Sequence, residues 1–140
     1  PVTLVFAKEK NEAAIKDALM NRRTVAVFKN LLIGRNEFLI PLIESSLKVV
    51  SARYTGKSSV LSVVLENGSS TDFLLQNLTG YTLHNTHDVV TLPAGAKTTI
   101  DIKTIDRKKN LILKFSVLNA VNAPNTHPEI LFTIKTEINE

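Results

Sequence analysis

The sequence contains no cysteine and no tryptophan, and aromatic residues make up only 6% of its 140 residues. Without cysteine, disulfides, thiolate metal sites and cysteine nucleophiles are all excluded. No apolar run approaches the roughly 18 residues that a membrane-spanning helix needs. The shortage of aromatic residues also counts against a surface that stacks nucleobases. We therefore expect neither membrane insertion nor a nucleic-acid partner.

The chain also has few clusters of charged residues, although its net charge is +4. The one basic cluster is Arg107-Lys108-Lys109, which lies between Asp106 and Asn110 and separates two strand-like segments. A phosphate-binding patch would need more basic residues and aromatic partners for bases. The cluster therefore predicts a solvent-exposed hairpin turn. Hydrophobic residues at 44% and charged residues at 21% are typical of a folded globular domain.

The first third of the chain has the order strand, helix, strand, helix. Residues 3–7 form an apolar run, and Asn11 is suited to cap a helix over 12–22. Residues 24–28 are rich in β-branched side chains and predict a second strand. Gly34 interrupts the pattern, and we expect Asn36 to cap a second helix with Pro41 in its first turn.

After residue 46 the apolar residues alternate with polar ones, which is typical of strands with one wet face. In residues 111–119 and 129–138 the alternation is clearest: Leu113 and Phe115 face one way and Lys114 the other. Asn67-Gly68 is a strong turn signal. Seven strands at regular spacing predict an antiparallel sandwich. The remaining predicted strands are 47–55, 58–66, 73–78, 88–92 and 97–105.

The sequence thus predicts an α+β, mainly β fold with two parts, residues 1–46 and residues 47–140. A lone βαβα segment cannot form a parallel sheet that is buried on both faces. Either this segment packs against the sandwich, or it is the tail of a larger domain that precedes Pro1; the absence of an initial Met favours the second interpretation. We expect its exposed strand edges to cause self-association through residues 1–30.

Four stretches in the first part are TLVFAKEK, AIKDAL, RRTVAVF and LLIGRNEFLIPL. Together they resemble the end of the PHP (polymerase and histidinol phosphatase) domain of metal-dependent phosphoesterases from Bacteroidetes-type bacteria. The remainder of the chain resembles, in pattern, the immunoglobulin-like domain that follows the catalytic barrel in that family. The stretches that carry the resemblance are 1–10, 13–19, 22–28 and 31–43.

The resemblance implies a distorted β/α barrel that holds two or three metal ions in motifs such as H-x-H and D-x-H. This chain contains neither motif, so no catalytic residue is carried over. Divalent metals are then expected only in an upstream catalytic domain, which would be the partner of this chain. Members of the family often look exported, which favours the periplasm or cell envelope and leaves the cytoplasm open.

The candidate metal ligands are His84, His87 and Asp88, in the pattern H-x-x-H-D. Three such ligands would suit zinc or a similar ion. Histidines three residues apart share a face only on a helix. The surrounding sequence indicates a loop or an edge strand, so these residues are better interpreted as polar loop residues than as metal ligands. His127 lies in a proline-bounded loop and is a poorer candidate still.

Other functional signals are absent or ambiguous. Ser58-Ser59 and Ser69-Ser70 lack the G-x-S-x-G pattern of a serine nucleophile. The N-glycosylation pattern occurs twice, at Asn67-Gly-Ser69 and Asn77-Leu-Thr79. Two matches to so short a pattern are readily explained by coincidence. The tyrosines and phenylalanines could form a sugar-stacking platform, but core packing explains most of them better.

The sequence therefore predicts a non-catalytic accessory domain of a PHP-type phosphoesterase, which supports the barrel or mediates assembly. The alternative is a stand-alone β-sandwich that binds carbohydrate or a protein partner. A small metalloprotein built on His84, His87 and Asp88 is the third possibility.

Overall fold

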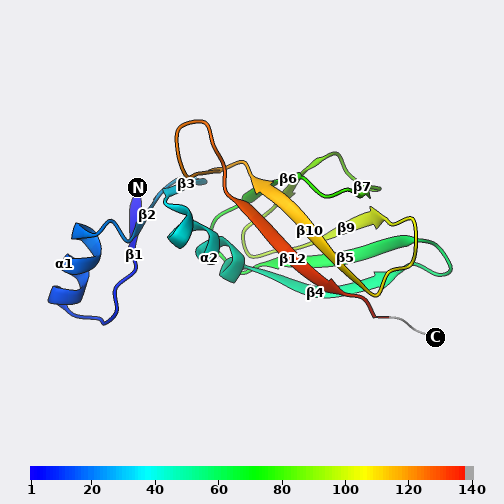
Figure 1. The fold of residues 1–140 in the computed structure, drawn as a ribbon, viewed down its shortest axis with the longest axis horizontal. Coiled ribbons are helices and arrows are strands. Elements are labelled where there is room, and N and C mark those ends of the chain that lie inside the picture. Colours follow the sequence, from blue (N-terminus) through cyan, green and yellow to red (C-terminus); the bar gives the residue numbers. More distant parts are fainter. Residues whose placement is uncertain (138–140) are drawn as a thin grey trace.

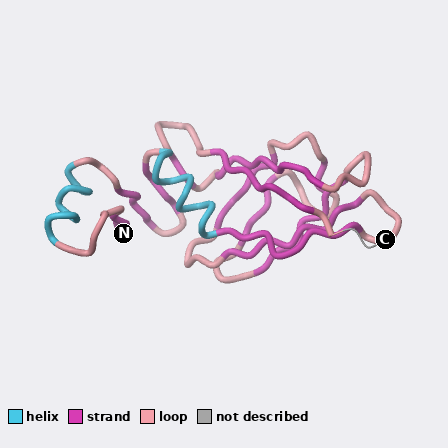
Figure 2. The backbone as a smooth tube through the Cα atoms, turned by 60° about the horizontal axis from the view of Figure 1, so that its bottom comes forward, coloured by secondary structure: helices cyan, strands magenta, loops and turns pink. Residues whose placement is uncertain are grey.

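The computed structural model of the protein describes residues 1–137. An N-terminal lobe, defined here as residues 1–46, lies at one end of an elongated molecule, and a β-sandwich forms the rest (Figure 1). The N-terminus lies in this lobe. Helix α2 (Asn36–Ser46) lies between the small sheet of the lobe and the sandwich, and helix α1 (Glu12–Met20) lies at the outer end (Figure 2).

Helix α1 begins where the sequence predicts and ends slightly earlier. The Asn11 side chain accepts a hydrogen bond from the backbone N–H of Ala14 at 2.8 Å, so Asn11 is the N-cap as predicted. Arg22 has a φ of 56°, in the left-handed region, and therefore lies beyond the helix. The backbone N–H of Arg23 then bonds the carbonyl of Ala18 at 2.9 Å, which turns the chain into the next strand.

The small sheet of the lobe has the order β1-β2-β3-β11. Its strands β1 and β2 are antiparallel, so the strand–helix–strand order does not produce the parallel pair of a βαβ unit. Strand β3 differs from the prediction that Gly34 interrupts the pattern, because Gly34 is the last residue of that strand and lies opposite Val25. The strands are β1 Val2–Val5, β2 Thr24–Phe28, β3 Leu31–Gly34 and β11 Ala120–Val121.

Helix α2 differs from the prediction at its start. Arg35 occupies the N-cap position and Asn36 is already helical, so Pro41 lies inside the helix rather than in its first turn. A proline there removes one backbone donor from the helix, yet the helix continues to Ser46. Burial explains this, because Leu39 and Ile43 are both fully buried against the core. Tertiary packing thus overrides the local cost of the proline.

Two four-stranded antiparallel sheets form the sandwich, which confirms the predicted fold class. One sheet has the order β12-β10-β6-β8 and the other β4-β5-β9-β7. The strands of the first sheet are β12 Glu129–Lys135, β10 Asn110–Val117, β6 Phe73–Asn77 and β8 Val89–Leu92. Those of the second are β4 Leu47–Tyr54, β5 Val60–Asn67, β9 Lys97–Lys103 and β7 Thr82–Leu83.

The core lies between the two sheets and follows the predicted alternation. Leu113 and Phe115 are fully buried, while Lys114 between them is exposed. Phe115 packs edge-on against Phe132 with the ring centres 5.9 Å apart. The core continues into the lobe, since Val25, Leu32 and the α2 side chains belong to the same cluster. Ile138, the end of the last predicted strand, lies outside the described residues.

The Asn67-Gly68 turn signal marks a change of sheet rather than a hairpin. Strand β5 ends at Asn67 in one sheet, and the next strand, β6, belongs to the other. Asn67 itself is buried, and its side-chain amide donates to the carbonyls of Thr71 and Leu92 at 2.8 and 3.0 Å. The side chain thereby ties the crossing segment to the edge of the sandwich.

Candidate docking surface

The candidate metal ligands lie in and beside the loop between β7 and β8. His84, His87 and Asp88 are all exposed, and the backbone N–H of His84 bonds the carbonyl of Asp101 at 2.7 Å. Within residues 1–137 no group of three or more His, Cys, Asp or Glu side chains is placed to hold a metal ion. His127 uses its Nδ1 atom in a contact of 2.7 Å with the Ala120 carbonyl, which anchors its loop to β11.

The two N-glycosylation patterns form a pair of similar turns. In each, the Asn side-chain oxygen accepts hydrogen bonds from the backbone N–H and the hydroxyl of the Ser or Thr two residues on. The Asn77 amide donates to the Tyr81 carbonyl at 2.8 Å, just as Asn67 bonds Thr71. Both amide groups are therefore already engaged within the fold, and these asparagines have a structural role.

Most aromatic side chains belong to the core, as the sequence predicts. Phe73, Phe115 and Phe132 are buried, and Phe6 and Phe38 pack against the core and each other, with ring centres 5.3 Å apart. Phe28 is the exception, with 51% of its surface exposed.

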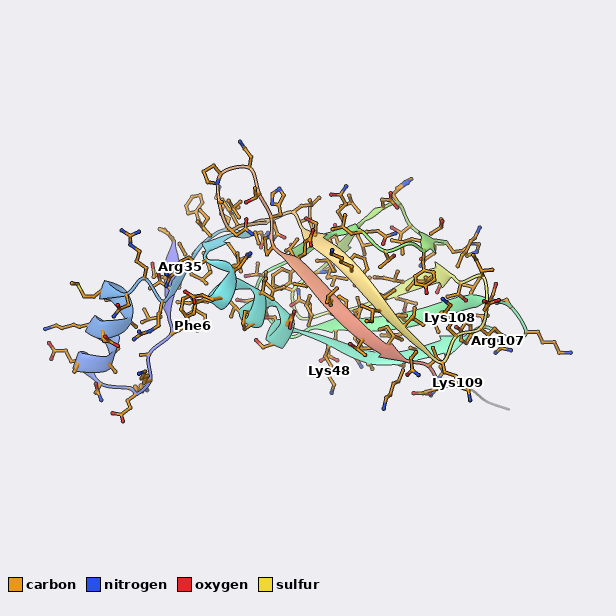
Figure 3. The ribbon with its side chains drawn as sticks, viewed as in Figure 1. Phe6, Arg35, Lys48, Arg107, Lys108 and Lys109 are labelled. Carbon is orange, nitrogen blue, oxygen red and sulfur yellow. The ribbon has the colours of Figure 1, made fainter. Side chains whose placement is uncertain are left out.

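The basic cluster Arg107-Lys108-Lys109 lies at the end of the sandwich away from the lobe (Figure 3). It lies between β9 and β10, which belong to different sheets, so the predicted hairpin is wrong and the cluster lies in an exposed connection between the sheets. The Tyr54 hydroxyl donates to the Lys108 carbonyl at 2.7 Å, and the Arg107 guanidinium lies 5.0 Å from the Tyr54 ring centre. Tyr54 thus stabilises this segment through a hydrogen bond from its hydroxyl and a cation–π contact of its ring.

The lobe and the sandwich are joined through the side chain of Asn119. Its amide donates to the carbonyls of Asn30 and Asp72 at 2.5 and 2.7 Å, and its oxygen accepts from the Leu74 N–H at 2.9 Å. One side chain therefore bonds the β2–β3 turn of the lobe and two positions at the start of β6. The two residues after it form β11, which pairs with β3 in parallel.

The lobe also contains an ion pair between Asp17 and Arg23. Arg23 donates a hydrogen bond to the Asp17 carboxylate and attracts it electrostatically, which lowers the pKa of Asp17 below its usual 3.8. Arg23 also donates from Nε to the Phe6 carbonyl at 3.3 Å. The arginine therefore connects α1 to the end of β1.

The most unusual surface of the molecule is one face of the small sheet, which we call the outer face. The other face of this sheet carries Val25 and Leu32, which are buried toward α2 and the sandwich. On the outer face the side chains are also mostly apolar, but Phe28 and Ile33 are 51% and 48% exposed. The apolar residues of the outer face are Val5, Ala26, Phe28, Leu31, Ile33 and Val121.

A shallow groove of about 510 Å³ lies on the outer face. Ala26, Ile33 and Val121 line it, and the loop after β11 forms one side. Arg22 and Arg35 also line the groove. Arg35 is held in place, because it donates to the carbonyls of Asn21 and Arg22 at 2.9 and 3.2 Å and pairs with Glu37 at 2.9 Å. The sequence contains a signal for this face: the strands TVAVF and LLIG are apolar at nearly every position, as strands covered on both faces are.

Among the described residues, neither helix is long and apolar enough to cross a membrane.

Comparisons with known proteins agree with the two-part architecture of a small lobe and a β-sandwich. A search of curated proteins gives no match. One solved structure that matches is a two-domain protein from Bacteroides vulgatus ATCC 8482 that contains a predicted PHP-like metal-dependent phosphoesterase. The match has a TM-score of 0.76 and 30% sequence identity, and it covers 95% of this chain. The chain spans only 38% of the length of that protein.

A family model described as an Ig-like domain, DUF5001, matches residues 47–133. The matched segment begins at the first residue of β4 and ends within β12, so it spans both sheets of the sandwich. Since the model covers more than half of the chain, the protein belongs to the DUF5001 family of Ig-like domains.

Proposed function

We propose that this chain is a non-catalytic accessory part of a PHP-type metal-dependent phosphoesterase, and that it supports the catalytic domain or mediates assembly. The observation that carries the proposal is the match of 95% of the chain to 38% of a two-domain protein with a predicted PHP-like phosphoesterase. The larger share of that protein is left for its other domain.

The side chains of this chain support a non-catalytic role. A metal-dependent phosphoesterase needs a set of ligands to hold the ions that activate water. Residues 1–137 contain no group of metal-ligating side chains placed to do so. In the proposal, the metal ions are bound by the catalytic domain, and the protein is located in the periplasm or cell envelope.

The proposal is tested on the native protein. Antibodies against this chain should detect, in lysates of the source organism, a polypeptide more than twice as long as 140 residues. The immunoprecipitate should hydrolyse p-nitrophenyl phosphate in the presence of Mn²⁺, and chelation should abolish this activity. Osmotic-shock fractions of the same cells report whether the protein is periplasmic or cytoplasmic.

A native band of about 140 residues, without associated phosphoesterase activity, would overturn the proposal. That outcome would instead support a stand-alone sandwich that binds carbohydrate or a protein partner.

A further inference from the structure

We propose that the outer face of the small sheet is the surface that docks the PHP domain of the same polypeptide. This inference rests on the proposed function and specifies the surface that serves it. Four observations carry it: the apolar composition of both faces of the sheet, the register of its strands, the charge around the groove and the position of the N-terminus.

The composition of the sheet indicates burial on both faces. An antiparallel sheet that packs on one side only has polar residues on its wet side. In this sheet Val25 and Leu32 are buried on the inner face, while the apolar Phe28 and Ile33 lie exposed on the outer face. Exposed apolar side chains that are contiguous, rather than scattered, mark an interaction surface.

The strand register makes the outer face continuous. Thr3 is opposite Ala26, Ala26 is opposite Ile33, and Ile33 is opposite Val121, so these four residues form one row across all four strands. Phe28 and Leu31 form a neighbouring pair. Ala26 is small, and the groove lies over it. A partner that inserts a protruding apolar side chain would fit this groove better than a partner with a flat, polar surface.

The charges around the face favour a different protein domain over a second copy of this chain. Arg22 and Arg35 line the groove, with Arg35 paired to Glu37, and the Lys29 amino group lies 5.6 Å from the Phe28 ring centre, so positive charges outnumber negative ones here. In a symmetric pair of copies these like charges would approach one another, which is unfavourable. A partner with an apolar centre and acidic groups at its edge is complementary.

The position of Pro1 fits this occupant. Pro1 immediately precedes β1, which is the edge strand of this sheet (Figure 1). A domain joined ahead of Pro1 would therefore emerge beside the outer face and need only a short connection to cover it. The two-domain relative has such a second domain in the length that this chain does not span.

The experiment uses the full two-domain polypeptide with a specific protease site inserted immediately before Pro1. After cleavage, the unmodified pair should co-elute on size-exclusion chromatography at low micromolar concentration. The double variant Phe28→Glu/Ile33→Glu should bind at least about tenfold more weakly, since buried apolar anchors dominate interface energies. Amide exchange in residues 24–34 should be slower in the uncleaved protein than in this chain alone.

The matched control is Ile112→Glu/Leu131→Glu on the sandwich, where the two side chains are 58% and 53% exposed. This control should co-elute like the unmodified pair. Thermal unfolding of this chain alone should be similar for both double variants, which separates a docking defect from misfolding. Arg22→Glu should weaken the association several-fold and reduce its dependence on salt.

Two results would overturn the inference. In the first, the cleaved Phe28→Glu/Ile33→Glu pair stays associated and residues 24–34 exchange equally fast in both forms. In the second, this chain alone is a dimer that the same variant converts to a monomer, so that a second copy covers the face. Either result leaves the proposed function standing, because the PHP domain would still be present in the native polypeptide; absence of that domain is detected by the immunoprecipitation instead.

Discussion

The strands of the sandwich and those of the lobe follow different rules. In β12 exposed and buried residues alternate without exception, and β10 follows the same phase. In β1 all four residues are exposed although three of them are apolar, and β2 has apolar side chains on both faces. The two sheets of the sandwich therefore cover each other's apolar faces. The sheet of the lobe is apolar on both faces, but its outer face is uncovered and its inner face is covered only away from β1, where Val2 is 59% exposed.

The difference is between a region whose two sheets cover each other and a region that leaves an apolar sheet face uncovered. The sandwich has two sheets that cover each other, while the small sheet has α2 and the sandwich on its inner face only. The Asn119 side chain connects the two regions. The following predictions test this comparison.

The largest expected effect is a difference in the free energy of unfolding between variants of a sandwich phenylalanine and a lobe phenylalanine. Phe115→Ala should lower the free energy of unfolding by about 3–5 kcal/mol, because it leaves a cavity at a fully buried position. Phe28→Ala should change it by less than about 0.5 kcal/mol in this chain alone, because half of the side chain is exposed. Urea denaturation measures both. Comparable losses for the two variants would show that the lobe is packed as tightly as the sandwich.

Next in size is the loss of the Asn119 side chain. Asn119→Ala should destabilise the fold by about 1–3 kcal/mol, because it leaves the Asn30 and Asp72 carbonyls and the Leu74 N–H without a partner. Hydrogen exchange should speed up more in β2 and β3 than in the sandwich. The control is Asn85→Ala, which removes side-chain hydrogen bonds to Thr99 and Asp101 within the sandwich. Equal changes in the lobe for both variants would contradict the connecting role of Asn119.

A glycine substitution tests how closely the inner face of the small sheet is packed. A Cβ at Gly34 would lie 3.0 Å from Val25 Cγ2 and 3.2 Å from the Thr24 carbonyl oxygen. Gly34→Ala should therefore cost about 1–2 kcal/mol, as overpacking does. Gly80 has no atom within 4 Å of the corresponding position, so Gly80→Ala should be close to neutral. A thermal melt that ranks these two variants in the opposite order would show that the inner face has room to spare.

The smallest expected effect is a pH dependence confined to α1. The pKa of Asp17 is lowered by its hydrogen bond and attraction to Arg23, so the pair stabilises the lobe above the unfolded value of 3.8. That contribution should be lost as the pH falls from 3.8 through the lower folded pKa. NMR signals of α1 should shift in this window, and Asp17→Asn should abolish the shift while leaving the sandwich signals unchanged. An identical titration in the variant would contradict the assignment.

Some of this structure was predictable because it depends on local sequence. The alternation around Leu113 and Phe115 defined which side chains are buried, since the period of a strand is two residues. Asn11 was predictable as an N-cap because its side chain bonds a backbone group only three residues away. The exposure of residues 107–109 was predictable from polar residues between two apolar runs, but the hairpin predicted there was wrong because β9 and β10 belong to different sheets.

Other features depend on partners far apart in the sequence. Strand β3 was missed because Gly34 weakens a strand locally, whereas its pairing with β2 and with β11, more than 80 residues on, stabilises it. Pro41 lies inside a helix because Leu39 and Ile43 are buried by distant strands. The outer face was missed as a surface because its residues are adjacent only once the four strands are in register.

By itself, the sequence determined the mainly β fold, the boundaries of most elements and the inward phase of the sandwich strands. Each of these follows from periodicity and capping, which act over a few residues. Only the tertiary structure decided that β1 and β2 are antiparallel, that Asn119 joins lobe and sandwich, and that one apolar sheet face remains exposed. These depend on which distant segments meet, because the free energy of burial is gained only when both surfaces are present.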